Sequence, residues 1–362
     1  MATLLKWNKS QFQSYLIGGL VLFFVAHFVL LSPASLEEDF NGVRVIDPKD
    51  LLSFLKNEPS VLAPEVPLNV APAYSLRDDT LYSSQGIKPN VKMISRKSNV
   101  YQKEEIIHSL DVVVEFPDHT QVQAKEGVFF TNQDKIHFYG HVHTTFPNGA
   151  ELFSEFAEAF TKPVTRIEIP VSELAIGTRK DPSSTVTFTS QGLEYVDVYP
   201  KNFHLLSDAK VQIVGDSTTD IHSDQAIYSY EKNHMHFFMN ESRPLSTQFV
   251  KVHQPDLDLK SRTLDVDTTD TQKLHTVTAL TDVWMRDSHD PEKLSIATSG
   301  KAVYDYTKNE VTLTEFPQVY QDDDTITGDV IIFHRNTDQI QVKQSNAIYN
   351  DNKNEQSKRS KE

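Results

Sequence analysis

One strand-turn-strand phrase occurs three times in this chain, and the repetition limits the possible folds more than any other feature. Residues 124–138, 223–237 and 299–313 align without gaps. Each copy has a small residue, an aromatic residue two positions later, a polar turn, and a second run with apolar residues two apart. That spacing is typical of β-strands, so each copy predicts an antiparallel hairpin. A looser fourth copy lies within Thr327–Val342.

Copies of one hairpin can bury their apolar faces only by stacking on one another. Short alternating runs separated by turn residues continue from Tyr74 to about Ile348, without a long segment of helical period. We therefore expect an all-β, elongated structure with a continuous apolar interior.

The N-terminal region contains an uncharged apolar run, Tyr15–Leu31. At about 1.5 Å per residue in a helix, a run of this length nearly crosses a bilayer core. Lysines precede the run and acidic residues follow it, which predicts a cytoplasmic N-terminus. The competing interpretation is a cleaved signal peptide, because Ser32–Ala34 resembles a cleavage site; the length of the run favours a retained anchor.

The sequence divides into six segments by composition. We expect a cytoplasmic N-terminus (1–14), a transmembrane anchor (15–31), a proline-rich linker (32–73), two β domains (74–215 and 216–349) and a disordered tail (350–362). The prolines of the linker predict an extended spacer rather than a packed element. A polar, turn-prone stretch at Gly215–Asp220 marks the boundary between the β domains.

Composition and motifs exclude several classes of function. The net charge of −15 argues against a nucleic-acid partner, and the absence of cysteine excludes thiol chemistry and disulfides. We find no nucleophile motif, metalloprotease motif or phosphate-binding loop, so we expect neither an enzyme nor a cofactor. The pairs His141/His143 and His234/His236 have a spacing that could hold a metal. No third ligand stands nearby in sequence, so we expect no metal site.

The inward face of the repeats is the remaining candidate for function. It could be the filled core of a sandwich, or it could stay partly open and hold the acyl chains of a lipid. On the second interpretation the lipid-binding residues are Phe129, Ile136, Phe138, Val142, Tyr228, Met235, Phe237, Tyr304, Val311, Leu313, Ile332 and Ile340.

Several of these strands resemble the lipopolysaccharide-transport bridge proteins of Gram-negative bacteria. In the first half, Asp111–Phe116 and Ile136–Gly149 resemble LptC, the member tethered to the inner membrane. In the second half, Asp224–Tyr230, Ser299–Tyr306 and Ile326–Asp338 resemble the soluble LptA/OstA type.

The resemblance implies a V-shaped, open β-jellyroll of antiparallel sheets, here as two tandem domains. It also implies that lipopolysaccharide passes along the apolar trough from an inner-membrane ABC exporter towards the outer membrane, and that further bridge proteins pair with the sheet edges. We therefore expect a single-pass inner-membrane protein with its bulk in the periplasm. The alternative is a membrane-anchored scaffolding protein with a filled core and no ligand.

Overall fold

The computed structural model describes residues 63–67, 70–85, 88–162, 164–242, 244, 248–289, 294–321, 324–337, 339–344 and 346–348. These residues all belong to one compact unit. The predicted anchor, the first part of the linker and the tail lie outside the described residues. Within the described ranges, no helix has the length and apolar character needed to cross a membrane.

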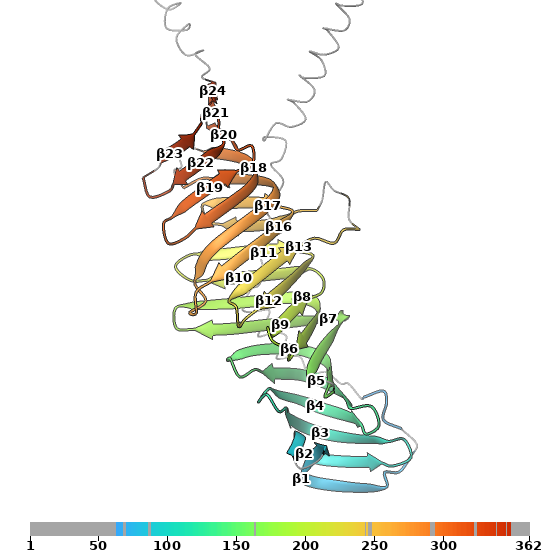
Figure 1. The fold of residues 1–362 in the computed structure, drawn as a ribbon. Helices are drawn as coiled ribbons and strands as arrows, with labels where there is room; N and C mark the ends of the chain where they lie inside the picture. Colours follow the sequence, from blue (N-terminus) through green and yellow to red (C-terminus); the bar gives the residue numbers. More distant parts are fainter. Residues whose placement is uncertain are drawn as a thin grey trace, which may run out of the picture. The chain divides into compact units, whose positions relative to one another are not determined.

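The described residues form 24 strands, which Figure 1 shows in chain order. They are β1 (Tyr74–Gln85), β2 (Lys88–Tyr101), β3 (Ile106–Glu115), β4 (Gln121–Phe130), β5 (Lys135–Thr145), β6 (Ala150–Phe160), β7 (Arg166–Asp181), β8 (Ser184–Val196), β9 (Asn202–Leu205), β10 (Ala209–Val214), β11 (Thr218–Ser223), β12 (Gln225–Ser229), β13 (His234–Phe238), β14 (Val250–Gln254), β15 (Leu257–Ser261), β16 (Thr263–Thr268), β17 (Leu274–Asp287), β18 (Ser295–Asp305), β19 (Glu310–Thr314), β20 (Gln318–Gln321), β21 (Asp324–Thr327), β22 (Val330–His334), β23 (Gln339–Lys343) and β24 (Asn346–Ile348). The prediction of an all-β fold is confirmed.

The strands pair antiparallel in two ladders, which we call sheet I and sheet II. They separate at β8, whose first half (Thr185–Thr189) pairs with β10 and whose second half (Leu193–Val196) pairs with β9. In β1–β7, the halves connected by pairing to Thr185–Thr189 belong to sheet I, and the halves connected to Leu193–Val196 belong to sheet II. Sheet I continues through β10, β11, β14, β15, β17, β18, β20, β21 and β24. Sheet II continues through β9, β12, β13, β16, β17, β18, β19, β22 and β23. Strand pairing is continuous from β1 to β24.

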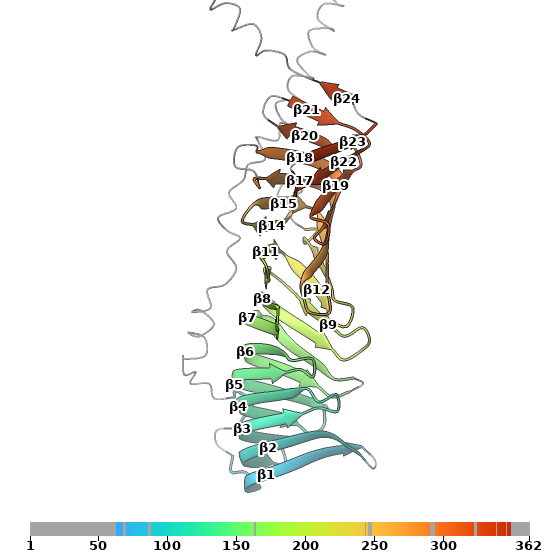
Figure 2. The ribbon, with the colours of Figure 1, turned by 90° about the vertical axis from the view of Figure 1, so that its left-hand side faces the viewer.

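Long strands belong to both sheets because each bends near its middle. In β8 the bend is at Gly192, which has φ of +77°, and a Cβ there would lie 2.9 Å from the Cα of Val171. In β17 the register shifts between Leu280 and Val283, and the intervening Thr281 and Asp282 both have positive φ. Extra residues of this kind bend a strand and redirect it. Figure 2 shows the two sheets diverging from these bends.

The three copies of the repeated phrase are the hairpins β4–β5, β12–β13 and β18–β19, all in sheet II. Their registers are equivalent, because the aromatic residue of the first strand faces the same position of the second in each hairpin: Phe129 with Ile136, Tyr228 with Met235, and Tyr304 with Val311. The structure therefore confirms the repeat.

The core lies between the sheets because inward and outward residues alternate along each strand. In β13, Met235 and Phe237 are 1% and 0% exposed. The intervening His236 faces outward and pairs with Asp265 of β16 at 2.7 Å, while His234 pairs with Asp267 at 2.8 Å. Apolar residues from both sheets join in one cluster along most of the ladder.

Candidate functional site

Most of the predicted lipid-binding residues lie in the core between the sheets. Phe129 and Ile340 are partly buried and pack against this core. The others at the inward face are buried: Ile136, Phe138, Val142, Tyr228, Met235, Phe237, Tyr304, Val311 and Leu313. Their contact with a lipid stays a prediction.

The placement of Ile332 with the inward residues is wrong by one position. Its neighbours Ile331 and Phe333 are buried in the core, whereas Ile332 lies on the alternate face of β22. Phe333 faces Ile340 across the fourth hairpin, as Tyr304 faces Val311 in the third. Aligning Phe333 with the aromatic residue of the other copies would have given the correct phase from the sequence.

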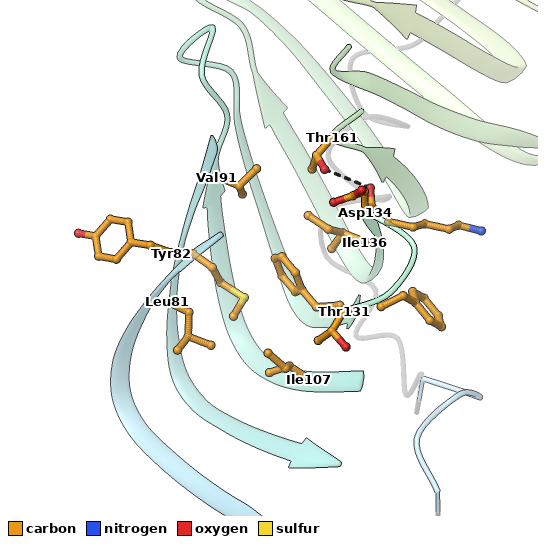
Figure 3. A pocket seen from close by; sticks show the side chains of 12 residues that line it. Leu81, Tyr82, Val91, Ile107, Thr131, Asp134, Ile136 and Thr161 are labelled. Carbon is orange, nitrogen blue, oxygen red and sulfur yellow. Dashed lines mark hydrogen bonds between the residues drawn. The ribbon is translucent and has the colours of Figure 1, made fainter. Parts of the chain in front are cut away.

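An open pocket of about 230 Å³ lies between the sheets at the β1 end of the ladder (Figure 3). Leu81, Val91 and Met93 line it from sheet I. Ile107, Phe129 and Ile136 are among the residues that line it from sheet II. The volume is somewhat below the about 300–1,000 Å³ of typical small-molecule pockets, so the pocket could take part of a long apolar chain.

The repeat predicted Phe129 and Ile136 as inward residues, but it did not predict the pocket wall formed by β1, β2 and β3. The repeated phrase begins at β4, so it gives no information about the first three strands. The alternation of Val91 and Met93, two apolar residues on one face of β2, was the available signal.

Polar residues also line this pocket, namely Thr131, Asp134, Lys135 and Thr161. Lys135 lies 2.9 Å from Glu158, and Lys162 donates to Asp134 at 2.6 Å. Thr161 donates to the carbonyl of Asp134 at 3.2 Å, as Figure 3 shows. The lining therefore combines apolar and polar side chains, which suits an amphipathic ligand.

Further along, aromatic rings fill the space between the sheets. The ring of Phe146, from the β5–β6 turn of sheet I, has its centroid 4.7 Å from the ring centroid of Tyr195 and 4.8 Å from that of Phe203, both in sheet II. Phe188 of sheet I lies 5.9 Å from the same Phe203. The gap beside Phe188 and Phe237 measures about 10 Å³. Such a space holds about one water molecule at most, so this stretch is a filled core.

The segment Ala63–Pro67 packs on the outer face of sheet II, and we call it the strap. Ala63 is 3% exposed, and Val66 packs against the same small apolar cluster as Phe130. Glu65 accepts hydrogen bonds from Tyr139 and from His137. The expectation of an unpacked spacer is therefore wrong for these five residues.

The strap carries a perturbed carboxyl group. Burial alone would raise the pKa of Glu65, but the hydrogen bonds from Tyr139 and His137 outweigh it, so the pKa lies below its ordinary value. Burial, together with the Glu65 carboxylate, raises the pKa of Tyr139. The ionised Glu65 is thus the form that holds the strap.

Each histidine of the two pairs lies beside carboxylates of a neighbouring strand, and His234 lies near both Asp265 and Asp267. His141 lies 3.2 Å from Glu155, and His143 lies 3.8 Å from Glu151. Across the described ranges, no group of three or more histidine, cysteine, aspartate or glutamate side chains could hold a metal ion.

Comparison with known proteins identifies one part of the chain. Residues 220–339 match the family described as LptA/(LptD N-terminal domain) LPS transport protein. The second β region is therefore similar to the LptA/LptD N-terminal domain over these residues. The resemblance of residues 74–215 to LptC stays a prediction. No curated protein matches the chain.

Among solved structures, one similar protein is LptH of Pseudomonas aeruginosa, the LptA-homologous periplasmic component of a conserved lipopolysaccharide transport device. The identity is 14%, and the alignment covers 36% of this chain and 94% of LptH. The TM-score is 0.32, which is too low to carry an argument about this chain.

Proposed function

We propose that this protein is a non-enzymatic, inner-membrane-anchored periplasmic carrier of lipopolysaccharide. It would accept the lipid from an ABC exporter and pass its acyl chains along the interior between the sheets. The match of residues 220–339 to the LPS transport family carries the proposal. The apolar run Tyr15–Leu31 supports the anchor, and the LptC-like motifs support placement beside the exporter.

The β1-end pocket is the proposed entry point. Apolar residues of both sheets surround it, and each methylene that it removes from water contributes about 0.8 kcal/mol. Charged residues in its lining would leave a polar headgroup in solvent. This arrangement reconciles an anionic lipid with a chain of net charge −15, because only the acyl chains enter the protein.

Strand edges are the proposed sites for further bridge proteins. β1 pairs only with β2, and β23 pairs only with β22, so each leaves one edge without a partner strand among the described residues. β24 pairs with β21 and so covers the edge of that strand. Unpaired edges accept strands from other domains.

The filled centre favours a second candidate, a membrane-anchored scaffold without a ligand. Aromatic packing between Phe146, Phe188 and Phe203 leaves no room for an acyl chain in the described conformation. The two candidates differ in whether lipid contacts the interior at all.

Photo-crosslinking in cells would separate them. A photoreactive residue at Phe129, in the pocket, should form adducts with lipopolysaccharide, and one at Phe237 should do so only during transport. A photoreactive residue at Gln123, exposed on β4, is the control and should give none. Absence of lipopolysaccharide adducts at Phe129, Met93 and Phe237, in a protein that is expressed and folded, would support the scaffold.

A further inference from the structure

The hairpin turns of the two sheets form two rows. We call the turns of sheet I, which include Asp118, Asp216 and Asp256, lip I, and the turns of sheet II, which include Thr271, Lys273 and Arg335, lip II. Each long strand runs from a turn in one lip, through its bend, to a turn in the other. The lips therefore lie at the ends of the sheets away from the bends, and any lateral opening of the interior must separate them.

Polar contacts join the lips at successive points. Tyr195 of sheet II donates to Asp118 of lip I at 3.3 Å. Ser184 of sheet I donates to the carbonyl of Thr271 in lip II at 2.7 Å. Lys273 of lip II donates to Asp216 of lip I at 3.1 Å.

Two further contacts lie deeper between the sheets. Arg179 of sheet I donates to the hydroxyl of Tyr228 in sheet II at 3.3 Å. Gln254 of sheet I donates to Tyr306, which stacks on Tyr304 with ring centroids 4.0 Å apart. Among the described residues, the series begins at Asp118 and ends at Arg335.

Arg335 makes the most extensive of these contacts. It lies in lip II after β22, is 5% exposed, and donates to both carboxylate oxygens of Asp287 in sheet I, at 2.9 and 3.2 Å. Its Nη1 donates to the hydroxyl of Tyr304 at 2.8 Å, and its Nη2, one of the two nitrogens that bind Asp287, also lies 2.8 Å from Asp256 of lip I. Burial alone would raise the pKa of Asp256, but His289 and Arg335 hold it below its ordinary value.

A buried ion pair of this kind defines a geometry more than it adds net stability. The free-energy cost of removing the charges from water offsets much of their attraction, so the pair adds little net stability. Its hydrogen bonds form only when the two sheets are correctly aligned, so the pair favours that alignment. When the lips separate, water hydrates both partners again. The contact can therefore open and close reversibly, unlike an apolar seam that would stay exposed after opening.

We propose that these polar contacts are latches that hold the interior closed beyond the β1-end pocket, with Arg335 as the terminal latch. The inference rests on the proposed function, since it takes the interior to be the lipid path. Acyl chains leaving the pocket would open the latches in turn and let them close behind.

Spin labels on the lips would test this directly. The chain contains no cysteine, so Ser288→Cys and Thr337→Cys, both exposed on opposite sides of the Arg335 contact, would be the only labelled sites. Distances between the labels are measured on the full-length chain without lipid. Arg335→Met should shift the distribution to longer and broader values.

Arg286→Met is the matched control. Arg286 also pairs with a buried carboxylate, Asp258, but at 2.9 Å within sheet I, so losing it should leave the inter-lip distance unchanged. Should Arg335→Met fail to fold by circular dichroism, Asp256→Asn removes one partner at a half-exposed position and should give a smaller shift in the same direction. An unchanged distribution in a folded Arg335→Met or in Asp256→Asn would overturn the latch.

Adding lipopolysaccharide to the labelled parent protein separates this inference from the proposed function. A shift towards the Arg335→Met distribution supports both. A response to the substitution but not to lipopolysaccharide leaves the latch standing and overturns the carrier role. A response to lipopolysaccharide without one to the substitutions overturns the latch alone.

Discussion

The packing of Phe188 on Gly177, its cross-strand neighbour in sheet I, provides a test of the filled centre. Gly177 of sheet I lies against the ring of Phe188, and a methyl group at position 177 would overlap three atoms of that ring. The ring has no free space to move into, because the adjoining gap is only about 10 Å³. Gly177→Ala should therefore destabilise the fold by about 1–3 kcal/mol, the usual cost of overpacking a core.

The cost should depend on the ring. Phe188→Ala alone should cost about 3–5 kcal/mol, the range for removing a buried phenylalanine. In the double variant the new methyl group enters the vacated space, so the combined loss should fall short of the sum by about 0.5–3 kcal/mol. Urea unfolding followed by circular dichroism measures all three values.

A matched glycine controls for the loss of chain flexibility. Gly215 lies in a turn where an added Cβ would meet its nearest atoms at 4.0 Å, so Gly215→Ala should be close to neutral. If Gly177→Ala proves as neutral as Gly215→Ala, or the double variant is strictly additive, the ring does not occupy this space. The interior would then be open at its centre.

Two further predictions concern register and pH. Phe237→Asp should unfold the protein or lower the free energy of unfolding by more than about 4 kcal/mol, because it buries a charge in the core. His236→Asp, on the outer face, should lower it far less. Equal losses in urea unfolding would mean that the assignment of inward and outward residues in β13 is wrong. The lowered pKa of Glu65 means that its contribution to strap docking is present above its unfolded pKa of 4.5 and is lost as pH falls through its lower folded value. The protection factor of the Val66 amide, which donates to the carbonyl of Ala63, should fall across that range in the parent chain. In Glu65→Gln the protection factor should already be low at neutral pH and should change little further.

The strands were predictable because their signals are local. Alternation and the repeated phrase placed the hairpins β4–β5, β12–β13 and β18–β19, and the inward face of each followed from its aromatic residue. The phase of Ile332 failed because four consecutive apolar residues, Val330–Phe333, hide the alternation. In the structure, β22 pairs with β19 so that Phe333 lies opposite Val311 and Ile331 opposite Leu313, in agreement with the aromatic position of the repeat.

The relation between the sheets was not predictable in the same way. Whether Phe188 fills the interior depends on Gly177, a residue 11 positions away that has no periodic signal of its own. The Arg335–Asp287 contact joins residues 48 positions apart, and neither stands in a motif. The strap was missed because its prolines indicated an extended chain, and an extended chain can still dock through one ionised side chain.

The turns of sheet II have a feature that bears on how this chain folds and how it could have lengthened. Each of four turns holds a residue with positive φ whose carbonyl accepts a backbone hydrogen bond from the last residue of a neighbouring strand or the first residue beyond it: Glu105 from Thr131, Asp134 from Thr161, Asn233 from Thr268, and Asn309 from Arg335. Each of these four turns therefore carries an acceptor for a neighbouring hairpin, so much of the backbone bonding is between adjacent units. Stability in such an array is approximately a sum over units and their interfaces. Loss of order should then spread inward from either terminus, and whole hairpins could be gained or lost in evolution without redesign of the remainder.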